Sequence, residues 1–183
     1  MPFDLQPALR GDLLELRPLR ADDFDALFAA ASDPLIWEQH PESDRYTAEK
    51  FRRYFDGAMQ SGGAFAVMDR ASGQVVGSTR YHGYDPVARE IEIGWTFLAR
   101  SHWGGAYNQE MKRLLLEHAF QFVDRVVFLV GPSNIRSQRA VEKIGGRLAG
   151  TRVSDGRESL LFVITAESLN RTEALIKLRE RSV

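Results

Sequence analysis

The sequence predicts a mixed α/β fold, in which one sheet holds parallel and antiparallel strands and carries helices on both faces. Two patterns lead to this prediction. Residues 64 to 98 show consecutive strand signals separated by short turns, which is typical of an antiparallel meander. Residues 105 to 164 alternate helices with strands before a final hairpin, which favours some parallel pairing. The length of 183 residues fits one domain, expected to span 1–183.

The first third of the chain predicts one strand followed by two helices. The strand covers Leu13 to Leu19, and Ala21-Asp22-Asp23 opens a helix that Asp33-Pro34 stops. Thr47 can cap the second helix, which ends at Ser61-Gly62-Gly63. Apolar residues recur at helical spacing in both: Phe24, Leu27, Phe28 and Ala31 in the first, and Phe51, Tyr54, Phe55, Ala58 and Met59 in the second.

The middle of the chain predicts three strands in series. They cover Ala64 to Met68, Gln74 to Tyr84 and Ala88 to Leu98. Turn residues separate them, because Asp69 to Gly73 joins the first pair and Asp85-Pro86 lies before the third. We therefore expect an antiparallel meander.

The last third predicts alternating helices and strands. In order, they are a helix over Gly105 to Val123, a strand over Arg125 to Val130, a helix over Asn134 to Ile144, a hairpin of Leu148 to Ser154 with Glu158 to Ile164, and a helix from Ala166 to about Arg181. The first of these helices places Met111, Leu114, Leu115, His118, Ala119 and Phe122 on its inner face. This α/β section is where we expect a ligand to bind.

Composition excludes several classes of function. The net charge is -1, so no overall positive field favours nucleic acid as a partner. There is no cysteine, and the four histidines show no metal-ligand spacing, so we expect no metal. The apolar runs are far shorter than a membrane span and the N-terminus lacks the pattern of a signal peptide. We expect a soluble, cytoplasmic protein that does not bind membranes.

A glycine pair suggests where an anion binds. Gly104-Gly105-Ala106 lies between the end of a strand and the start of a helix, where free backbone amides and the helix dipole favour a phosphate or pyrophosphate. It is neither a Walker A loop nor a GxGxxG motif. A tight connection without a ligand is the alternative.

A second segment gives this loop a family context. Asn134-Ile-Arg-Ser-Gln-Arg-Ala-Val-Glu-Lys-Ile-Gly-Gly146 follows at the spacing of a neighbouring β-α unit. Together with Trp103-Gly-Gly-Ala-Tyr-Asn-Gln-Glu110, it resembles the GCN5-related N-acetyltransferases (GNAT) of the RimJ/RimL-like branch. The resemblance extends over a core of about 13–164 and leaves 165–183 as a C-terminal helical extension. It implies a mixed, largely antiparallel seven-stranded sheet flanked by helices on both faces.

The resemblance implies acetyl-CoA as acetyl donor and assigns the residues that bind it. The splayed end of a strand, at Trp95, Thr96, Phe97 and Leu98, would pair with the pantetheine amides. The loop of Trp103, Gly104, Gly105, Ala106, Tyr107 and Asn108 would hold the pyrophosphate, and Asn134 the pantetheine arm. Gly105 occupies the position where relatives usually have a basic residue. A positive charge to balance the phosphates would therefore come from Arg100, Arg136 or Arg139.

The resemblance also suggests the catalytic residues. Glu92 matches the general base, with Glu90 as its rival. The tyrosine that many relatives use as general acid corresponds to Val141, so Ser137 is the candidate donor to the leaving thiolate. Trp37, His40 and His82 would line the acceptor pocket; His82 could instead relay a proton, and Trp37 could instead fill the core.

The function that follows is transfer of acetyl from acetyl-CoA to a primary amine, by direct attack in a ternary complex. The acceptor would be a small-molecule amine or a protein N-terminus. The alternative is a catalytically impaired module that binds acyl-CoA, which Val141 keeps open. The C-terminal helix could pack on the sheet edge or join a homodimer.

Overall fold

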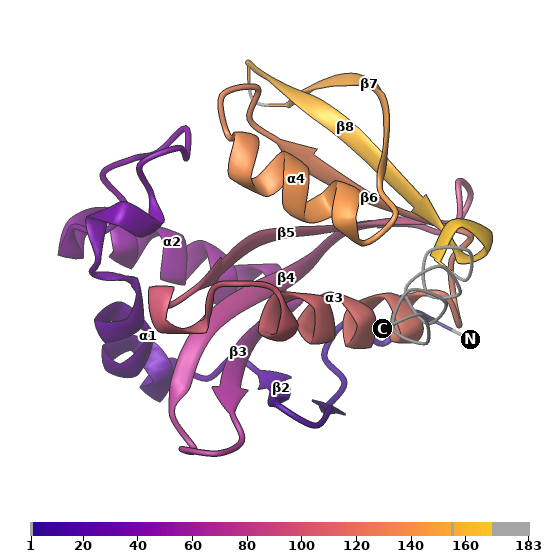
Figure 1. The fold of residues 1–183 in the computed structure, drawn as a ribbon. Helices are drawn as coiled ribbons and strands as arrows, with labels where there is room; N and C mark the ends of the chain where they lie inside the picture. Colours follow the sequence, from indigo (N-terminus) through magenta and orange to yellow (C-terminus); the bar gives the residue numbers. More distant parts are fainter. Residues whose placement is uncertain (1, 155, 170–183) are drawn as a thin grey trace, which may run out of the picture.

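The computed structural model describes residues 2–154 and 156–169 and has a single eight-stranded sheet at its centre (Figure 1). The sheet order is β1-β2-β3-β4-β5-β6-β8-β7. The strands are β1 (Leu9–Arg10), β2 (Leu14–Pro18), β3 (Ala64–Asp69), β4 (Val75–Asp85), β5 (Glu90–Leu98), β6 (Arg125–Val130), β7 (Arg147–Ser154) and β8 (Arg157–Thr165). The helices are α1 (Phe24–Ala31), α2 (Ala48–Ser61), α3 (Ala106–Ala119) and α4 (Ile135–Lys143), with short 3-10 turns at Ala21–Asp23, Pro34–Ile36 and Arg100–His102.

Strand pairing confirms the mixed sheet. Neighbouring strands are antiparallel except β5 and β6, which pair in parallel across the α3 crossover. The seven strands that the sequence indicates are present. The eighth is β1, a two-residue strand paired with β2, and two residues are too few to show an alternating pattern.

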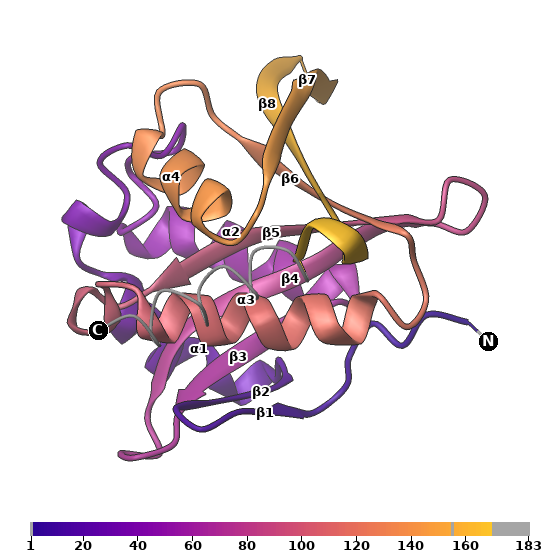
Figure 2. The ribbon, with the colours of Figure 1, turned by 45° about the vertical axis from the view of Figure 1, so that its right-hand side comes forward.

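Helices cover both faces of the sheet. Figure 2 shows α3 in front of the strands, with α1 and α2 behind them. One apolar cluster joins α3 and α4 to the sheet, through residues such as Leu115, Val141 and Ile93. A second, rich in aromatic rings, joins α1 and α2 to the opposite face. The prediction of helices on both faces is therefore confirmed.

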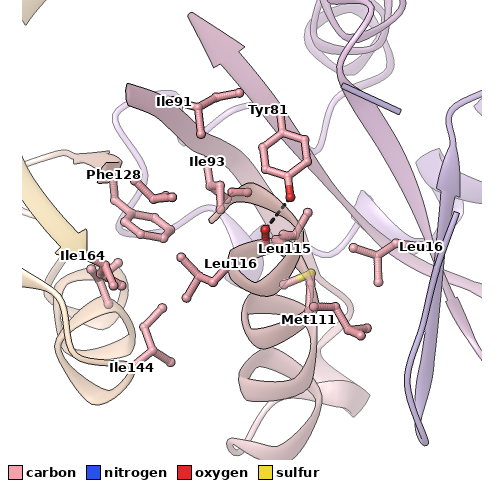
Figure 3. Close-up of a cluster of buried hydrophobic side chains, with 14 of the residues drawn as sticks. Leu16, Tyr81, Ile91, Ile93, Met111, Leu115, Leu116, Phe128, Ile144 and Ile164 are labelled. Atoms are coloured by element: carbon pink, nitrogen blue, oxygen red, sulfur yellow. Dashed lines mark hydrogen bonds between the residues drawn. The ribbon is translucent and has the colours of Figure 1, made fainter. Parts of the chain in front are cut away.

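Helix α3 is fixed to the sheet by apolar and polar contacts. Figure 3 shows Tyr81 of β4 pointing at the helix, where its hydroxyl donates to the carbonyl of Leu115. At the next turn toward the start of α3, the Glu110 carboxylate accepts the amides of Asp12, Leu13 and Leu14 at 2.7 to 2.8 Å. These contacts hold the beginning of α3, and the loop before it, in a set position.

Some boundaries differ from the sequence predictions. Helix α3 ends at Ala119 rather than Val123, and a 3-10 turn precedes α1 because the Asp23 carboxylate holds the Arg20 amide. Thr47 is the N-cap residue of α2, as predicted, but its side chain makes no cap bond, since the Thr47 hydroxyl donates to the carbonyl of Asp44.

The predicted C-terminal helix is described only in its first residues. Residues 166–169 are helical, and Leu169 is buried in the cluster that α3 covers. The rest of that prediction, to about Arg181, lies outside the described residues. Within the described ranges, no helix combines the length and the apolar character that crossing a bilayer needs.

Candidate active site

Strands β5 and β6 separate midway along their length. Their parallel pairing runs from Glu90 opposite Arg125 to Glu92 opposite Val127, and no later pair joins them, although β5 continues to Leu98 and β6 to Val130. The two strands diverge from this point, with α4 above and α3 below (Figure 1). Backbone groups of both strands are therefore left without a ladder partner inside the sheet.

A β-bulge lies in the separated part of β5. The β4 register places Ser78 opposite Phe97 and Arg80 opposite Gly94, so β5 has one extra residue between these pairs. Trp95 adopts a φ of +50°, which is unusual for a bulky side chain. The Tyr54 hydroxyl of α2 donates to the Trp95 carbonyl at 2.7 Å and fixes this conformation. The bulge falls among the residues expected to face pantetheine.

A buried lysine reaches this part of β5. Lys112 of α3 donates to the Thr96 hydroxyl at 2.9 Å, and its ammonium lies 5.1 Å from the ring centre of Phe128 on β6. Burial lowers the pKa of Lys112 to about 7. The sequence reasoning missed this residue, although its spacing from Leu116 and Ala119 puts it in line with the apolar stripe of α3.

The loop before α3 has the form of an anion site. Gly104 and Gly105 have φ of +106° and +120°, a region that favours glycine, and a Cβ on either would meet nothing within 4 Å. The first helical bond runs from the Gln109 amide to the Gly105 carbonyl, so the amides of Ala106, Tyr107 and Asn108 have no acceptor within the helix. The Trp103 indole anchors the loop by donating to Leu98.

Helix α4 begins on the other side of the separation. The Asn134 side-chain oxygen caps this helix by accepting the Ser137 amide at 3.2 Å. Neither the Asn134 side-chain nitrogen nor the Ser137 hydroxyl has a partner within residues 2–154 and 156–169. Both groups are thus available to a ligand.

The three candidate countercharges differ in their partners. Arg100 pairs with Asp33. Arg136 donates to the Ile36 carbonyl and lies 4.2 Å from the Trp103 ring, linking α4 to the loop before α3. Arg139 is exposed and has no ion pair with any described carboxylate.

The two candidate bases on β5 have different surroundings. Glu90 is held by Arg125 and Arg152. Glu92, at the last β5–β6 pair, has no ion pair within the described part of the chain, and burial raises its pKa to about 7. The missing side chain of Gly94 leaves space for the Glu92 carboxylate, since a Cβ there would lie 3.0 Å from it. Glu92 is the better placed to accept a proton near neutral pH.

The residues expected at the acceptor pocket are not equivalent. His82 lies opposite Glu92 on β4, with its ring 4.9 Å from that of Trp95, and burial lowers its pKa. His40 is close to Trp37, and burial together with Arg45 lowers its pKa to about 4. Trp37 is 2% exposed, belongs to the apolar cluster under α1 and α2 and donates to the Ala31 carbonyl.

Comparison with known proteins places the chain in a family. The model of the acetyltransferase (GNAT) domain family matches residues 14–147, more than half of the chain. The chain belongs to the GNAT acetyltransferases. The family prediction from the Trp103 and Asn134 segments is therefore confirmed.

Solved GNAT structures share the fold. A GCN5-related N-acetyltransferase from Brucella melitensis is 26% identical, with a TM-score of 0.81 over 94% of this chain and 86% of that one. RimJ of Mycobacterium smegmatis, solved with CoA-disulfide, is 24% identical, with a TM-score of 0.65 over 88% of each chain, a level of identity that shows the fold alone.

A curated relative matches over a shorter stretch. The Bacillus subtilis protein YkkB is 45% identical over 58 residues, which is 30% of this chain and 33% of that protein. The matched stretch thus spans about a third of YkkB. Among the described residues of this GNAT chain, no group of three or more His, Asp or Glu side chains is placed to hold a metal ion.

Proposed function

We propose that this chain transfers the acetyl group of acetyl-CoA to a primary amine by direct attack in a ternary complex, with Glu92 as general base. The observation that carries the proposal is the end of β5–β6 pairing at Glu92. It puts a carboxyl group with a pKa of about 7 where an unpaired stretch of backbone begins. The acceptor class is a small-molecule amine or a protein N-terminus.

The residues on both sides of the separation fit an extended donor that ends in phosphates. Trp95, Thr96, Phe97 and Leu98 offer the β5 backbone to pantetheine, and the Asn134 side-chain nitrogen is free to donate from the other side. The amides of Ala106, Tyr107 and Asn108 suit the pyrophosphate. Arg139 is the arginine in this region without an ion-pair partner among the described residues, so it is the proposed countercharge.

Glu92 would prepare the acceptor. A protonated amine has no lone pair with which to attack a thioester, so one proton must leave it first. A carboxylate with a pKa of about 7 matches this task at neutral pH. His82, opposite Glu92, is proposed to line the acceptor side of the site together with His40.

Acetyl-CoA supplies the thioester: the new C–N bond forms as the C–S bond breaks, and CoA leaves as the thiol. Ser137 is the proposed donor toward the departing sulfur, because its hydroxyl has no partner within the described ranges. Val141 is buried and has no proton to give. The amine proton passes to Glu92 and the sulfur gains one through Ser137 and solvent, so the charges balance.

The proposal is tested by CoA release with a panel of amines. The chain has no cysteine, so a thiol reagent reports released CoA without a protein background. We expect release that depends on the amine, with an acetylated product by mass spectrometry. Acetyl-CoA should also slow hydrogen exchange at residues 93–98 and 106–108. Absence of both release and protection would contradict the proposal.

A further inference from the structure

A buried arginine lies beside the proposed base without a counterion. Arg80 of β4 is 6% exposed and makes no ion pair with a carboxylate in the described part of the chain. Its one hydrogen bond, to the Tyr54 carbonyl, is long at 3.5 Å, and its Nε has no partner. Rings stack against it instead, with Trp95 at 4.5 Å and Tyr54 at 5.8 Å. A buried charge without a counterion is costly, so an anion placed there would be strongly stabilised.

A second arginine approaches the same tyrosine. Arg45 is also 6% exposed, and its guanidinium lies 4.9 Å from the Tyr54 ring and 5.1 Å from the Trp37 ring. It pairs with Glu42, but its Nε has no partner either. Arg45 and Arg80, together called the arginine pair below, thus each hold an unused donor near Tyr54.

The contact between Arg45 and His40 does not resolve this deficit. The His40 Nδ1 accepts the Glu42 amide at 2.9 Å, which requires the proton of the neutral ring to be on Nε2. The same Nε2 lies 3.3 Å from a guanidinium nitrogen of Arg45. That tautomer brings two donors together, and the other tautomer breaks the bond to Glu42. An acceptor atom from outside would satisfy Arg45 without this conflict.

Arg80 and Glu92 share one face of the sheet. Arg80 is opposite Gly94 and His82 is opposite Glu92, so Arg80 and Glu92 are diagonal neighbours on adjacent strands. The Cα atoms of diagonal neighbours on adjacent strands lie roughly 7–8 Å apart, a distance that one small molecule can bridge. The charges of Arg80 and Glu92 influence each other's pKa, yet they form no ion pair.

We propose that the acceptor is an amino acid, whose amine is placed at Glu92 and whose carboxylate binds the arginine pair, with Arg80 as the main contact. This inference rests on the proposed acetyl transfer and names its substrate class. The planar guanidinium fork matches a carboxylate, and one uncompensated arginine charge balances one carboxylate charge. The rings of Trp95 and Tyr54 exclude water from that pair and so strengthen it.

The test compares free amino acids with their carboxamides as acceptors. Each pair differs only in the charged group, so we expect kcat/KM to favour the acid by about 100-fold or more. Arg80→Met removes the charge but keeps the bulk, and should erase this preference by lowering kcat/KM for the acids far more than for the carboxamides. Arg80→Lys should restore part of it. Arg53→Met is the matched control, because Arg53 is exposed and, among the described residues, forms an ion pair only with Glu49.

A binding measurement makes the test independent of turnover. The Trp95 ring lies 4.5 Å from Arg80, so titration with each amino acid should change tryptophan fluorescence in wild type and not in Arg80→Met. Circular dichroism should show Arg80→Met folded, with a melting temperature no lower than that of wild type.

The outcomes separate the two proposals. Turnover of amines without a preference for the acid overturns the inference and leaves acetyl transfer standing. Preference for phosphoethanolamine over ethanolamine, without one among the amino acids, overturns the carboxylate assignment. If no amine releases CoA, the proposal of acetyl transfer fails, and the fluorescence titration then decides the inference. The absence of a saturable change that depends on Arg80 would overturn it.

Discussion

Two glutamates of β5 show how much the surroundings of a side chain decide its chemistry. Glu90 forms ion pairs with Arg125 and Arg152. Glu92, two positions further, has no such partner among the described residues, and its pKa rises to about 7 because burial disfavours the charge. The sequence pattern selects Glu92 by family position, and the structure adds a physical reason for the same choice.

Replacing the Glu92 carboxylate should slow turnover. Glu92→Gln keeps the shape and removes the base, so we expect kcat to fall ~100- to 10,000-fold with acetyl-CoA affinity nearly unchanged. In wild type, the rate should rise with pH through about 7, because the carboxylate forms above its pKa. The variant should lack this ionisation in a pH–rate profile.

Glu90→Gln is the matched control for this experiment. It should lower stability, since Arg125 and Arg152 lose their shared partner, while changing kcat little. Full activity in both variants, measured with a turned-over amine, would remove Glu92 from the mechanism.

Lys112 should lower the stability of the fold at neutral pH. Its folded pKa of about 7 lies below the ordinary value of 10.5, so between these pH values the unfolded chain binds more protons. The free energy of unfolding should therefore rise with pH across that window. Lys112→Met should abolish this rise and stabilise the protein at pH 7 by on the order of 2–4 kcal/mol.

Urea unfolding at pH 7 and pH 9 measures this effect. Lys50→Met is the control, because the Lys50–Asp44 pair is exposed and should contribute little. A Lys112→Met protein that is less stable than wild type at both pH values would show that the bond to Thr96 outweighs the cost of burial.

At the level of elements, the ligand-binding character of the α3 N-terminus was predictable, but the buried contacts of Lys112 and Arg80 were not. Gly104 and Gly105 indicate a close approach of backbone to ligand, and their positive φ values agree with that local requirement. The sequence pattern indicates a helix at Lys112 and a strand at Arg80, but it does not indicate that either side chain is buried. Their burial depends on strands β5 and β6 and on helix α2, which come from distant parts of the chain.

The amides at the start of α3 can be tested by crowding. Ala106 is exposed at the first position of the helix, so Ala106→Val should fold normally. The branched side chain should obstruct a pyrophosphate bound to the neighbouring amides and weaken acetyl-CoA affinity about tenfold or more. Calorimetric titration measures this affinity, and Ala88→Val, in the exposed turn before β5, is the control. Equal acetyl-CoA affinity in both variants would show that the phosphates bind elsewhere.

At the scale of the whole molecule, the topology was predictable because each strand and helix carries its own periodic pattern. The order of the eight strands in the sheet does not follow from these patterns, since β8 pairs with β6 and places β7 at the edge. The acceptor side was the least predictable part. The loop between α1 and α2 folds across to α4, where Gln39 accepts the Arg136 amide, and this contact joins residues far apart in sequence.

Removing residues 170–183 should leave acetyl-CoA binding intact, because every residue proposed to hold the donor lies before residue 140. The cut belongs after Leu169, since this side chain is buried in the core that α3 covers. We expect unchanged affinity by calorimetric titration and a cooperative melting transition. A cut after Ile164 is the comparison, and should lower the melting temperature by removing Leu169. Loss of affinity in a folded chain ending at Leu169 would assign the donor site a contribution from 170–183.

The separation of β5 from β6 gives the sheet two additional edges, located in its interior rather than at β1 or β7. Unpaired edges invite another chain to add a strand, which is a common route to aggregation. A bound donor would protect these edges and, by mass action, stabilise the native state by about 2.7 kcal/mol at a concentration 100 times its dissociation constant. Shelf life and solubility of the purified protein should therefore depend on CoA as much as its activity does.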